Sequence, residues 1–298
     1  MTYSDILLRG LVGSNPLGAM AAFGLLRVCS EIPNLVGARL YWAWDQDWRA
    51  VLRLPDGWGQ EELIELLVLR QKGRSLDEFN WSGDIKVSPD EYRERMLSHV
   101  VNSSLYQRQG ADFFAAYGSE MVLDQTKKGN VKPTELHMTA GQQKFLKLIH
   151  KDLAKSMSKK TAEAYGEALF GPWRREDNVN ALGWDPASRR LHALRHRAPS
   201  SDVFHCVRAA IWLAVEALPL FPTAASSGRL QTTGFTTTRP VMFAWPIWKP
   251  PIGLDTLRTL IMTSDRPTSL QRRGVAAIYR SERAESGRGG AFLRPCTE

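Results

Sequence analysis

The sequence contains few cysteines, and their placement excludes a disulfide framework. There are three, Cys29, Cys206 and Cys296, an odd number at wide spacing, and there is no Cys-x-x-Cys pair to suggest a redox or structural zinc site. Cys29 and Cys206 fall inside apolar helical patterns, where a thiol behaves as a small hydrophobic side chain. This usage predicts a protein of a reducing compartment, the cytoplasm.

Long hydrophobic runs are missing as well. The apolar run over residues 17–26 is too short to span a bilayer, and it follows the polar Gly13, Ser14 and Asn15 without a basic leader. The run predicts a buried helix, and we expect neither a signal peptide nor contact with a membrane. The three polar residues before it are expected to be structural.

The sequence also lacks the common catalytic and cofactor-binding motifs. It has no Gly-x-x-x-x-Gly-Lys phosphate loop, no dinucleotide fingerprint and no nucleophile elbow. We therefore expect no catalytic residue, no cofactor and no bound metal. One alternative stays open, because Asp77, Asp84 and Lys86 fit a loose pattern for metal-dependent phosphodiester hydrolysis, with two carboxylates on the metal and a lysine orienting water. Ordinary loop charges account for the same residues.

A pair of histidines offers a second metal hypothesis. His192 and His196 are four residues apart and would share one face of a helix. The segment around them has the alternation of a strand, however, in which they would lie about 13 Å apart. We therefore do not expect a metal there.

Charge is unevenly distributed along the 298 residues, whose net charge is +8. Residues 1–125 hold 12 basic and 17 acidic side chains, residues 126–160 hold nine and two, and residues 161–298 hold 18 and 12. An acidic N-terminal part, residues 1–125, and a basic remainder, residues 126–298, predict one surface for protein neighbours and another for a nucleic acid.

The most one-sided stretch runs from Lys127 to Lys160, where Glu135 and Asp152 are the only acids. Thr139 and Gln142 have the spacing of a capping box and predict a helix over residues 139–160. With about 100° of rotation per residue, four apolar side chains share one face of this helix and four lysines line the opposite one. These are Phe145, Leu148, Ile149 and Leu153, against Lys144, Lys147, Lys151 and Lys155.

Lysines stacked at helical spacing repel one another by roughly 0.2–0.5 kcal/mol per pair, and a bound polyanion removes that cost. We therefore predict that the helical lysines, with Lys127, Lys128 and Lys132 of the preceding loop, hold the phosphates of a nucleic acid. Side chains suited to base edges are expected nearer the bases, namely Asn130, Gln142, Gln143, Arg229 and Gln231. A solvated lysine face and a threonine-rich edge strand are the alternatives without a ligand.

The hydrophobic periodicity predicts an α+β fold. The N-terminal part indicates a mixed antiparallel sheet with helices, and the basic remainder is expected to be more helical. The clearest signals are a strand over residues 5–11, a helix with Pro16 in its first turn, and a hairpin over residues 39–54. Further along, residues 182–195 predict strand, turn and strand, and Ser201 is expected to cap the next helix.

Five stretches occur in order over most of the chain: Gly13-Ser-Asn-Pro-Leu-Gly-x-x-Ala-Ala-x-Gly-Leu-Leu-Arg27, Thr139-Ala-Gly-Gln-Gln-Lys-Phe-Leu146, Gly183-Trp-Asp-Pro with Ala193-Leu-Arg195, Glu216-Ala-Leu-Pro-Leu-Phe-Pro222 and Leu230-Gln-Thr-Thr-Gly-Phe235. Together they resemble a family of CRISPR-associated proteins, the large-subunit-like proteins of the type I-G systems, formerly called I-U. Each stretch is short, and their common order carries the resemblance.

The resemblance implies a subunit of an RNA-guided surveillance complex, or Cascade, in antiviral defence. Such a subunit is expected to contact the guide RNA, to inspect the short motif that flanks the double-stranded target DNA, and to support R-loop formation, while base pairing reads the rest. Its other partners would be the backbone and handle-binding subunits, and a helicase–nuclease recruited in trans would cut the DNA. A purely structural subunit of a defence complex is the remaining alternative.

Overall fold

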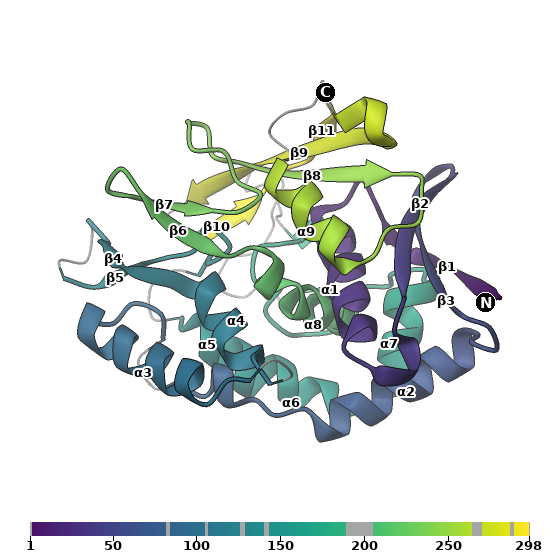
Figure 1. The fold of residues 1–298 in the computed structure, drawn as a ribbon, viewed down its shortest axis with the longest axis horizontal. Helices are drawn as coiled ribbons and strands as arrows, with labels where there is room; N and C mark the ends of the chain where they lie inside the picture. Colours follow the sequence, from purple (N-terminus) through teal and green to yellow (C-terminus); the bar gives the residue numbers. More distant parts are fainter. Residues whose placement is uncertain are drawn as a thin grey trace, which may run out of the picture.

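The computed structural model describes residues 2–81, 84–104, 107–125, 129–139, 143–188, 205–263, 270–286 and 289–297. It has the α+β fold that the sequence predicts (Figure 1). Some predicted features lie outside the described residues, namely Lys127, Lys128, Gln142, His192, His196 and Ser201.

The N-terminal sheet and its helix form as the sequence predicts. Strands β1 (Tyr3–Val12), β2 (Arg39–Asp45) and β3 (Asp47–Pro55) make an antiparallel sheet in the order β1-β3-β2. Helix α1 (Pro16–Ser30) follows β1, and the side chain of Asn15 accepts hydrogen bonds from the backbone N–H groups of Leu17 and Gly18. These contacts satisfy donors that a helix start leaves open.

A second antiparallel sheet comes from the C-terminal part of the chain. It contains β8 (Met242–Trp248), β9 (Val275–Ser286), β10 (Gly289–Phe292) and β11 (Cys296–Thr297), with β9 at its centre. Two buried tryptophans of β8 tie it to the N-terminal segment. The Nε1 of Trp245 donates to the carbonyl oxygen of Gly13 at 2.7 Å, and the Nε1 of Trp248 donates to that of Leu40 at 2.8 Å.

Two short hairpins pack against each other at another edge of the molecule. One pairs β4 (Gly118–Leu123) with β5 (Val131–Pro133), and the other pairs β6 (Thr223–Ser226) with β7 (Arg229–Thr232). The hydroxyl of Thr223 donates to the carbonyl oxygen of Gly118 at 2.8 Å, and that of Thr232 accepts from the backbone N–H of Glu135 at 3.1 Å. The contact joins segments about a hundred residues apart in sequence.

Helices α1 and α8 (Arg208–Glu216) pass through the centre of the molecule (Figure 1). They cross so closely that a Cβ on Gly24 would lie 1.8 Å from the carbonyl oxygen of Leu213, so only glycine fits there. The other longer helices are α2 (Gln60–Gly73), α3 (Pro89–Val101), α4 (Gln109–Tyr117), α7 (Thr161–Phe170) and α9 (Leu254–Thr263). No helix among the described residues has both the length and the apolar composition needed to cross a bilayer.

The two predicted parts share one main hydrophobic core. It contains Phe23 and Trp42 from the N-terminal part and Trp212 and Trp248 from the remainder. Within the described residues, the three longest helices, α1 to α3, belong to the N-terminal part, whereas the sequence led us to expect the more helical part after residue 125. The difference arises because the remainder supplies all four strands of the second sheet. The first strand predicted within residues 182–195 is also wrong, because residues 182–188 form a turn and a short 3-10 helix, and the residues after 188 lie outside the described part of the chain.

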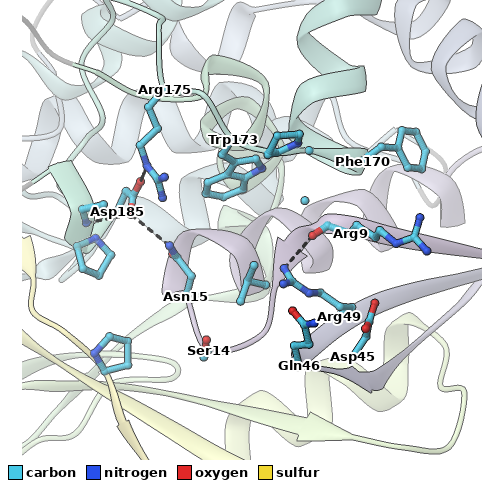
Figure 2. Close-up of a pocket in the computed structure, with 17 residues that line it drawn as sticks. Arg9, Ser14, Asn15, Asp45, Gln46, Arg49, Phe170, Trp173, Arg175 and Asp185 are labelled. Carbon is cyan, nitrogen blue, oxygen red and sulfur yellow. Dashed lines mark hydrogen bonds and ion pairs between the residues drawn. The ribbon is translucent and has the colours of Figure 1, made fainter.

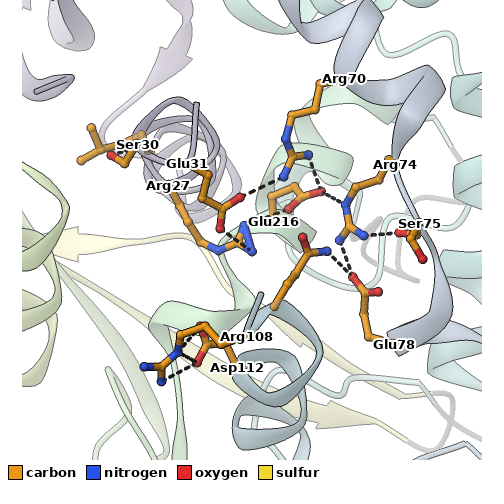
Figure 3. Close-up of polar contacts among 12 residues, drawn as sticks. Arg27, Ser30, Glu31, Arg70, Arg74, Ser75, Glu78, Arg108, Asp112 and Glu216 are labelled. Carbon is orange, nitrogen blue, oxygen red and sulfur yellow. Dashed lines mark hydrogen bonds and ion pairs between the residues drawn. The ribbon is translucent and has the colours of Figure 1, made fainter. Parts of the chain in front are cut away.

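A buried ion cluster joins three helices around one carboxylate (Figure 3). Glu216, the last residue of α8, is fully buried, and its oxygens accept hydrogen bonds from Arg27 of α1 at 3.0 Å, Arg70 of α2 at 3.1 Å and Arg74 at 2.9 Å. Burial raises the pKa of Glu216, but the nearby charges of Arg74, Arg70 and Arg27 outweigh burial and lower this pKa to about 2. The carboxylate is therefore charged in the folded protein.

The pKa of Glu216 predicts how stability depends on acid. Because this pKa falls from 4.5 to about 2 on folding, Glu216 stabilises the folded state fully above pH 4.5, and the stabilisation is lost as the pH falls from 4.5 to about 2. We expect the free energy of unfolding, measured by urea titration, to decline more steeply over this window in the wild type than in Glu216→Gln. Parallel declines would contradict the assignment.

Candidate nucleic-acid interface

The predicted lysine helix is present over residues 145–157. It comprises α5 (Phe145–Lys147), a π-helical turn (Leu148–Leu153) and α6 (Ala154–Met157). The predicted facing is confirmed, because Phe145, Ile149 and Leu153 are buried and Leu148 is half-buried. The lysines of the opposite face, Lys144, Lys147, Lys151 and Lys155, are exposed.

The predicted capping box at Thr139 is wrong. The helix begins at Phe145, and the Thr139 hydroxyl lies 3.3 Å from the Nε2 of His137. A residue far earlier in the chain caps the helix: the carboxylate of Asp84 accepts the backbone N–H groups of Phe145 at 3.0 Å and Leu146 at 2.9 Å. A negative charge there also complements the positive end of the helix dipole.

The environment of Asp84 keeps its carboxylate charged. Burial raises the pKa of this group, but hydrogen bonds from His137 and from the backbone of Leu146 and Phe145 outweigh burial, and the pKa is lowered. The Nε2 of His137 lies 3.5 Å from the carboxylate. Asp84 thus acts as an ionised cap for the lysine helix.

An open groove of about 710 Å³ runs along the lysine helix. We call it the lysine groove. Three separate segments line it: the helix with its following turn, residues 177–180 and the first residue of α8. Its cationic side chains are Lys151, Lys155, Lys159, Lys160 and Arg208, its amides are Gln143, Asn178 and Asn180, and its acids are Asp152 and Asp177.

Arg208 fixes the wall of the lysine groove opposite the helix. Its guanidinium pairs with the carboxylate of Asp177 and donates to the backbone oxygen of Lys159 at 2.8 Å. The backbone N–H of Arg208 donates to Asp177 as well, at 2.9 Å. Lys160 has an acidic neighbour, Glu163, at 3.4 Å. The exposed lysines of the helix therefore face a wall held in place by an ion pair.

The structure divides the predicted phosphate-binding lysines into separate groups. Lys151 and Lys155 line the lysine groove, whereas Lys144 and Lys147, on the turn before the π-helical segment, do not. A π turn bonds residue i to i+5, so it changes the phase of the side chains that follow it. Lys132 lies on β5, where it faces Glu135 at 3.6 Å.

The residues predicted to contact bases also lie in different parts of the structure. Gln143 is exposed at the lysine groove. Arg229 and Gln231 are exposed on one face of β7, with Leu230 and Thr232 buried between and beyond them. Asn130 is used structurally, because its side-chain amide donates to the carbonyl oxygen of Lys86 at 3.0 Å and joins β5 to the loop before α3.

Of the cationic and amide side chains that line the lysine groove, five were not predicted from the sequence. Lys159 and Lys160 belong to the lysine-rich stretch, so their composition was a usable signal. Asn178, Asn180 and Arg208 reach the groove from distant segments, and nothing in their local sequence marks them.

Two of the three residues of the hydrolytic alternative make contacts that do not involve one another. Asp84 is committed to capping, Lys86 lies 3.8 Å from Asp124, and Asp77 is exposed on a short 3-10 turn. Across the described part of the chain, no group of three or more His, Cys, Asp or Glu side chains is arranged to hold a metal ion.

Comparison with protein-family models gives no match for the chain, and comparison with curated proteins gives none either. The function must therefore be inferred from the charge, the cavities and the resemblance found in the sequence.

Proposed function

We propose that the protein is a non-catalytic nucleic-acid-binding subunit, and that the lysine groove holds a phosphate backbone. One observation supports the proposal above the others. Five cationic side chains, four of them from residues 151–160 and the fifth Arg208 of α8, line one open groove against two acids, and one of these acids, Asp177, is already paired with Arg208.

The groove has the properties that a phosphate backbone needs. Lys151, Lys155 and Lys159 are exposed, so their ammonium groups can exchange condensed counterions for phosphates, and the released ions drive binding. The amides of Gln143, Asn178 and Asn180 add donors and acceptors that reach sugars or base edges. Because the groove is open, a long strand can lie along it, which a small closed cavity would not allow.

The resemblance to type I-G large-subunit-like proteins supports a more specific role. In that role the protein would bind the guide RNA and the flanking motif of double-stranded target DNA, beside backbone and handle-binding subunits, while a helicase–nuclease acts in trans. The exposed Arg229 and Gln231 on β7 are suited to reading base edges of that motif. A cytoplasmic location is part of the same proposal.

The proposal predicts a large change in salt dependence on neutralising the groove. We expect the variant Lys151→Ala/Lys155→Ala/Lys159→Ala to bind duplex DNA and single-stranded RNA at least tenfold more weakly at about 0.15 M salt. The slope of log affinity against log salt should become shallower by about 2.7 for duplex DNA and by about 2.1 for single-stranded RNA, since each lost phosphate contact removes about 0.9 or about 0.7 respectively. Fluorescence anisotropy titrations from about 50 to about 200 mM salt measure both quantities.

A matched control removes the same charge elsewhere. Arg39, Lys72 and Lys249 are exposed and line neither the lysine groove nor the cavity described below. The variant Arg39→Ala/Lys72→Ala/Lys249→Ala should keep the slope of the wild type. Equal losses in the two variants would show a general effect of net charge, and an unchanged slope in the groove variant would refute the phosphate role.

A further inference from the structure

A second cavity, of about 780 Å³, lies at the start of α1 (Figure 2). We call it the arginine pocket. Residues from the end of β1, the turn between β2 and β3, and the segment from 170 to 187 line it. In Figure 2, Phe170, Trp173 and Arg175 lie along one side, and Asn15, Ser14, Gln46 and Arg49 lie along the other. Its volume is that of a site for a drug-sized ligand.

A buried carboxylate holds the two sides of the arginine pocket together. Asp185 is 1% exposed, and its oxygens accept hydrogen bonds from the amide of Asn15 at 3.2 Å, the Nε of Arg175 at 3.1 Å and the backbone N–H of Ala187 at 3.1 Å. Asn15 is the residue that caps α1, so the contact links the pocket to the most buried helix. The pocket is therefore built by the fold and does not depend on a ligand for its shape.

Two residues of the pocket adopt a left-handed backbone that side chains other than glycine rarely take. Gln46 has a φ of 61° and Arg175 has a φ of 57°. Such conformations cost about 1–3 kcal/mol and are concentrated at binding and catalytic sites. Here they direct an amide and a guanidinium to the same cavity.

The pocket combines an aromatic surface with cations available to an anion. The indole of Trp173 is half-buried, and its Nε1 donates to the backbone oxygen of Ala168 at 3.0 Å, which fixes the ring plane. The guanidinium of Arg175 lies over one face of this ring, 5.5 Å from its centroid, so a base would stack on the opposite face. Two acids, Asp45 and Asp185, also line the pocket, but among the described residues neither Arg9 nor Arg49 has an acidic partner within ion-pair distance. The guanidinium of Arg49 donates to the carbonyl oxygen of Arg9 at 2.9 Å and retains further donors.

A nucleotide combines the two chemical groups that this pocket could bind. It has a planar base, which can stack on an indole, and a phosphate, which can pair with arginine. A base stacks on an indole whatever its identity, and guanidinium groups bind phosphate through paired donors. The amide of Gln46 can pair with a base edge, because it carries both a donor and an acceptor. The arginine pocket therefore offers groups for the base and for the phosphate of a nucleotide.

We propose that the arginine pocket binds one nucleoside monophosphate unit, with its base against Trp173 and its phosphate on Arg9 and Arg49. The unit is either a free nucleotide or a single unstacked residue of a strand. The nucleotide site is a second site, separate from phosphate-backbone binding in the lysine groove, and the proposal for it does not depend on that function. The two sites are nevertheless adjacent in the chain, since residues 177–180 line the lysine groove and Arg175 and Asp185 line the arginine pocket.

The test uses 2-aminopurine, whose fluorescence falls when its ring stacks on an aromatic side chain. One probe is 2-aminopurine riboside 5′-monophosphate, and the other is a single-stranded oligonucleotide with one internal 2-aminopurine. We expect saturable quenching of at least one probe by the full chain. Quenching by the free nucleotide identifies a small-molecule site, and quenching of the strand alone identifies a site for an unstacked base; either result supports the proposal.

The variants separate stacking from folding. Trp173→Leu should weaken the quenched complex about tenfold or more, whereas Trp173→Phe, which loses the same hydrogen bond to Ala168 but keeps a ring, should retain most of the binding. The double variant Arg9→Gln/Arg49→Gln should also weaken binding of the 2-aminopurine probe. The control is Trp44→Leu, because Trp44 is 65% exposed and lies outside the pocket.

Absence of quenching for both probes would overturn the proposal, and so would equal quenching in the wild type and Trp173→Leu. These outcomes are distinguishable from failure of the lysine groove. The groove variant changes the salt slope of strand binding, whereas the pocket variants change quenching of the free nucleotide, which carries a single phosphate.

Discussion

Replacing Glu216 with glutamine is expected to lower the free energy of unfolding by about 3–5 kcal/mol, because it removes a fully buried charge that three arginines share. The side chains of Arg27 and Arg74 are 3% and 4% exposed, so water cannot replace the lost partner. A glutamine oxygen still accepts a hydrogen bond, but the three arginines are then left with two carboxylates, Glu31 and Glu78, in place of three. Urea unfolding at neutral pH, followed by circular dichroism, measures the change.

The control for this prediction is a second glutamate of the same cluster. Glu31 pairs with Arg27 at 3.2 Å and with Arg70 at 3.1 Å, but its side chain is 40% exposed. Ion pairs that water reaches contribute about 1 kcal/mol or less, so Glu31→Gln should cost much less than Glu216→Gln. A loss below about 1 kcal/mol in Glu216→Gln itself would show that the three arginines do not depend on Glu216.

The sequence predicted the elements whose signals are local. Helix α1 could be placed because Asn15 and Pro16 adjoin an apolar run, and the β2–β3 hairpin because alternating residues flank a short polar turn. The apolar face of the lysine helix followed from spacing alone. In each case the residues that decide the structure lie within about one or two turns of one another.

The features that the sequence did not predict depend on contacts between distant residues. Glu216 contacts arginines that lie 142 to 189 positions away in the sequence, and a single glutamate at the end of an apolar helix gives no sign of such partners. The arginine pocket needs Asn15 beside Asp185, which is 170 positions away. In both cases burial creates the site, because a polar group removed from water requires partners from whichever segments pack against it.

Replacing Asp84 with alanine is expected to destabilise the protein by about 3 kcal/mol, because the backbone N–H groups of Phe145 and Leu146 would lose their acceptors inside the protein. The φ of Asp84 is 66°, a conformation that asparagine and aspartate tolerate better than alanine. Asp84→Asn keeps one acceptor oxygen and the tolerance for this backbone, so it should cost roughly half as much. Urea unfolding of the two variants and the wild type gives the order.

The same variants distinguish a helix cap from a metal ligand. If Asp84 bound a divalent cation, magnesium would stabilise the wild type over EDTA, and alanine would abolish that difference. As a cap, Asp84 stabilises the protein equally in magnesium and in EDTA, so the loss in Asp84→Ala should be the same in both. The cap also predicts a functional effect without any chemistry, because fraying the start of the helix disturbs the lysines that follow. Nucleic-acid affinity should therefore fall with Asp84→Ala, and less with Asp84→Asn. A magnesium-dependent stability that disappears in Asp84→Ala would instead support the hydrolytic alternative.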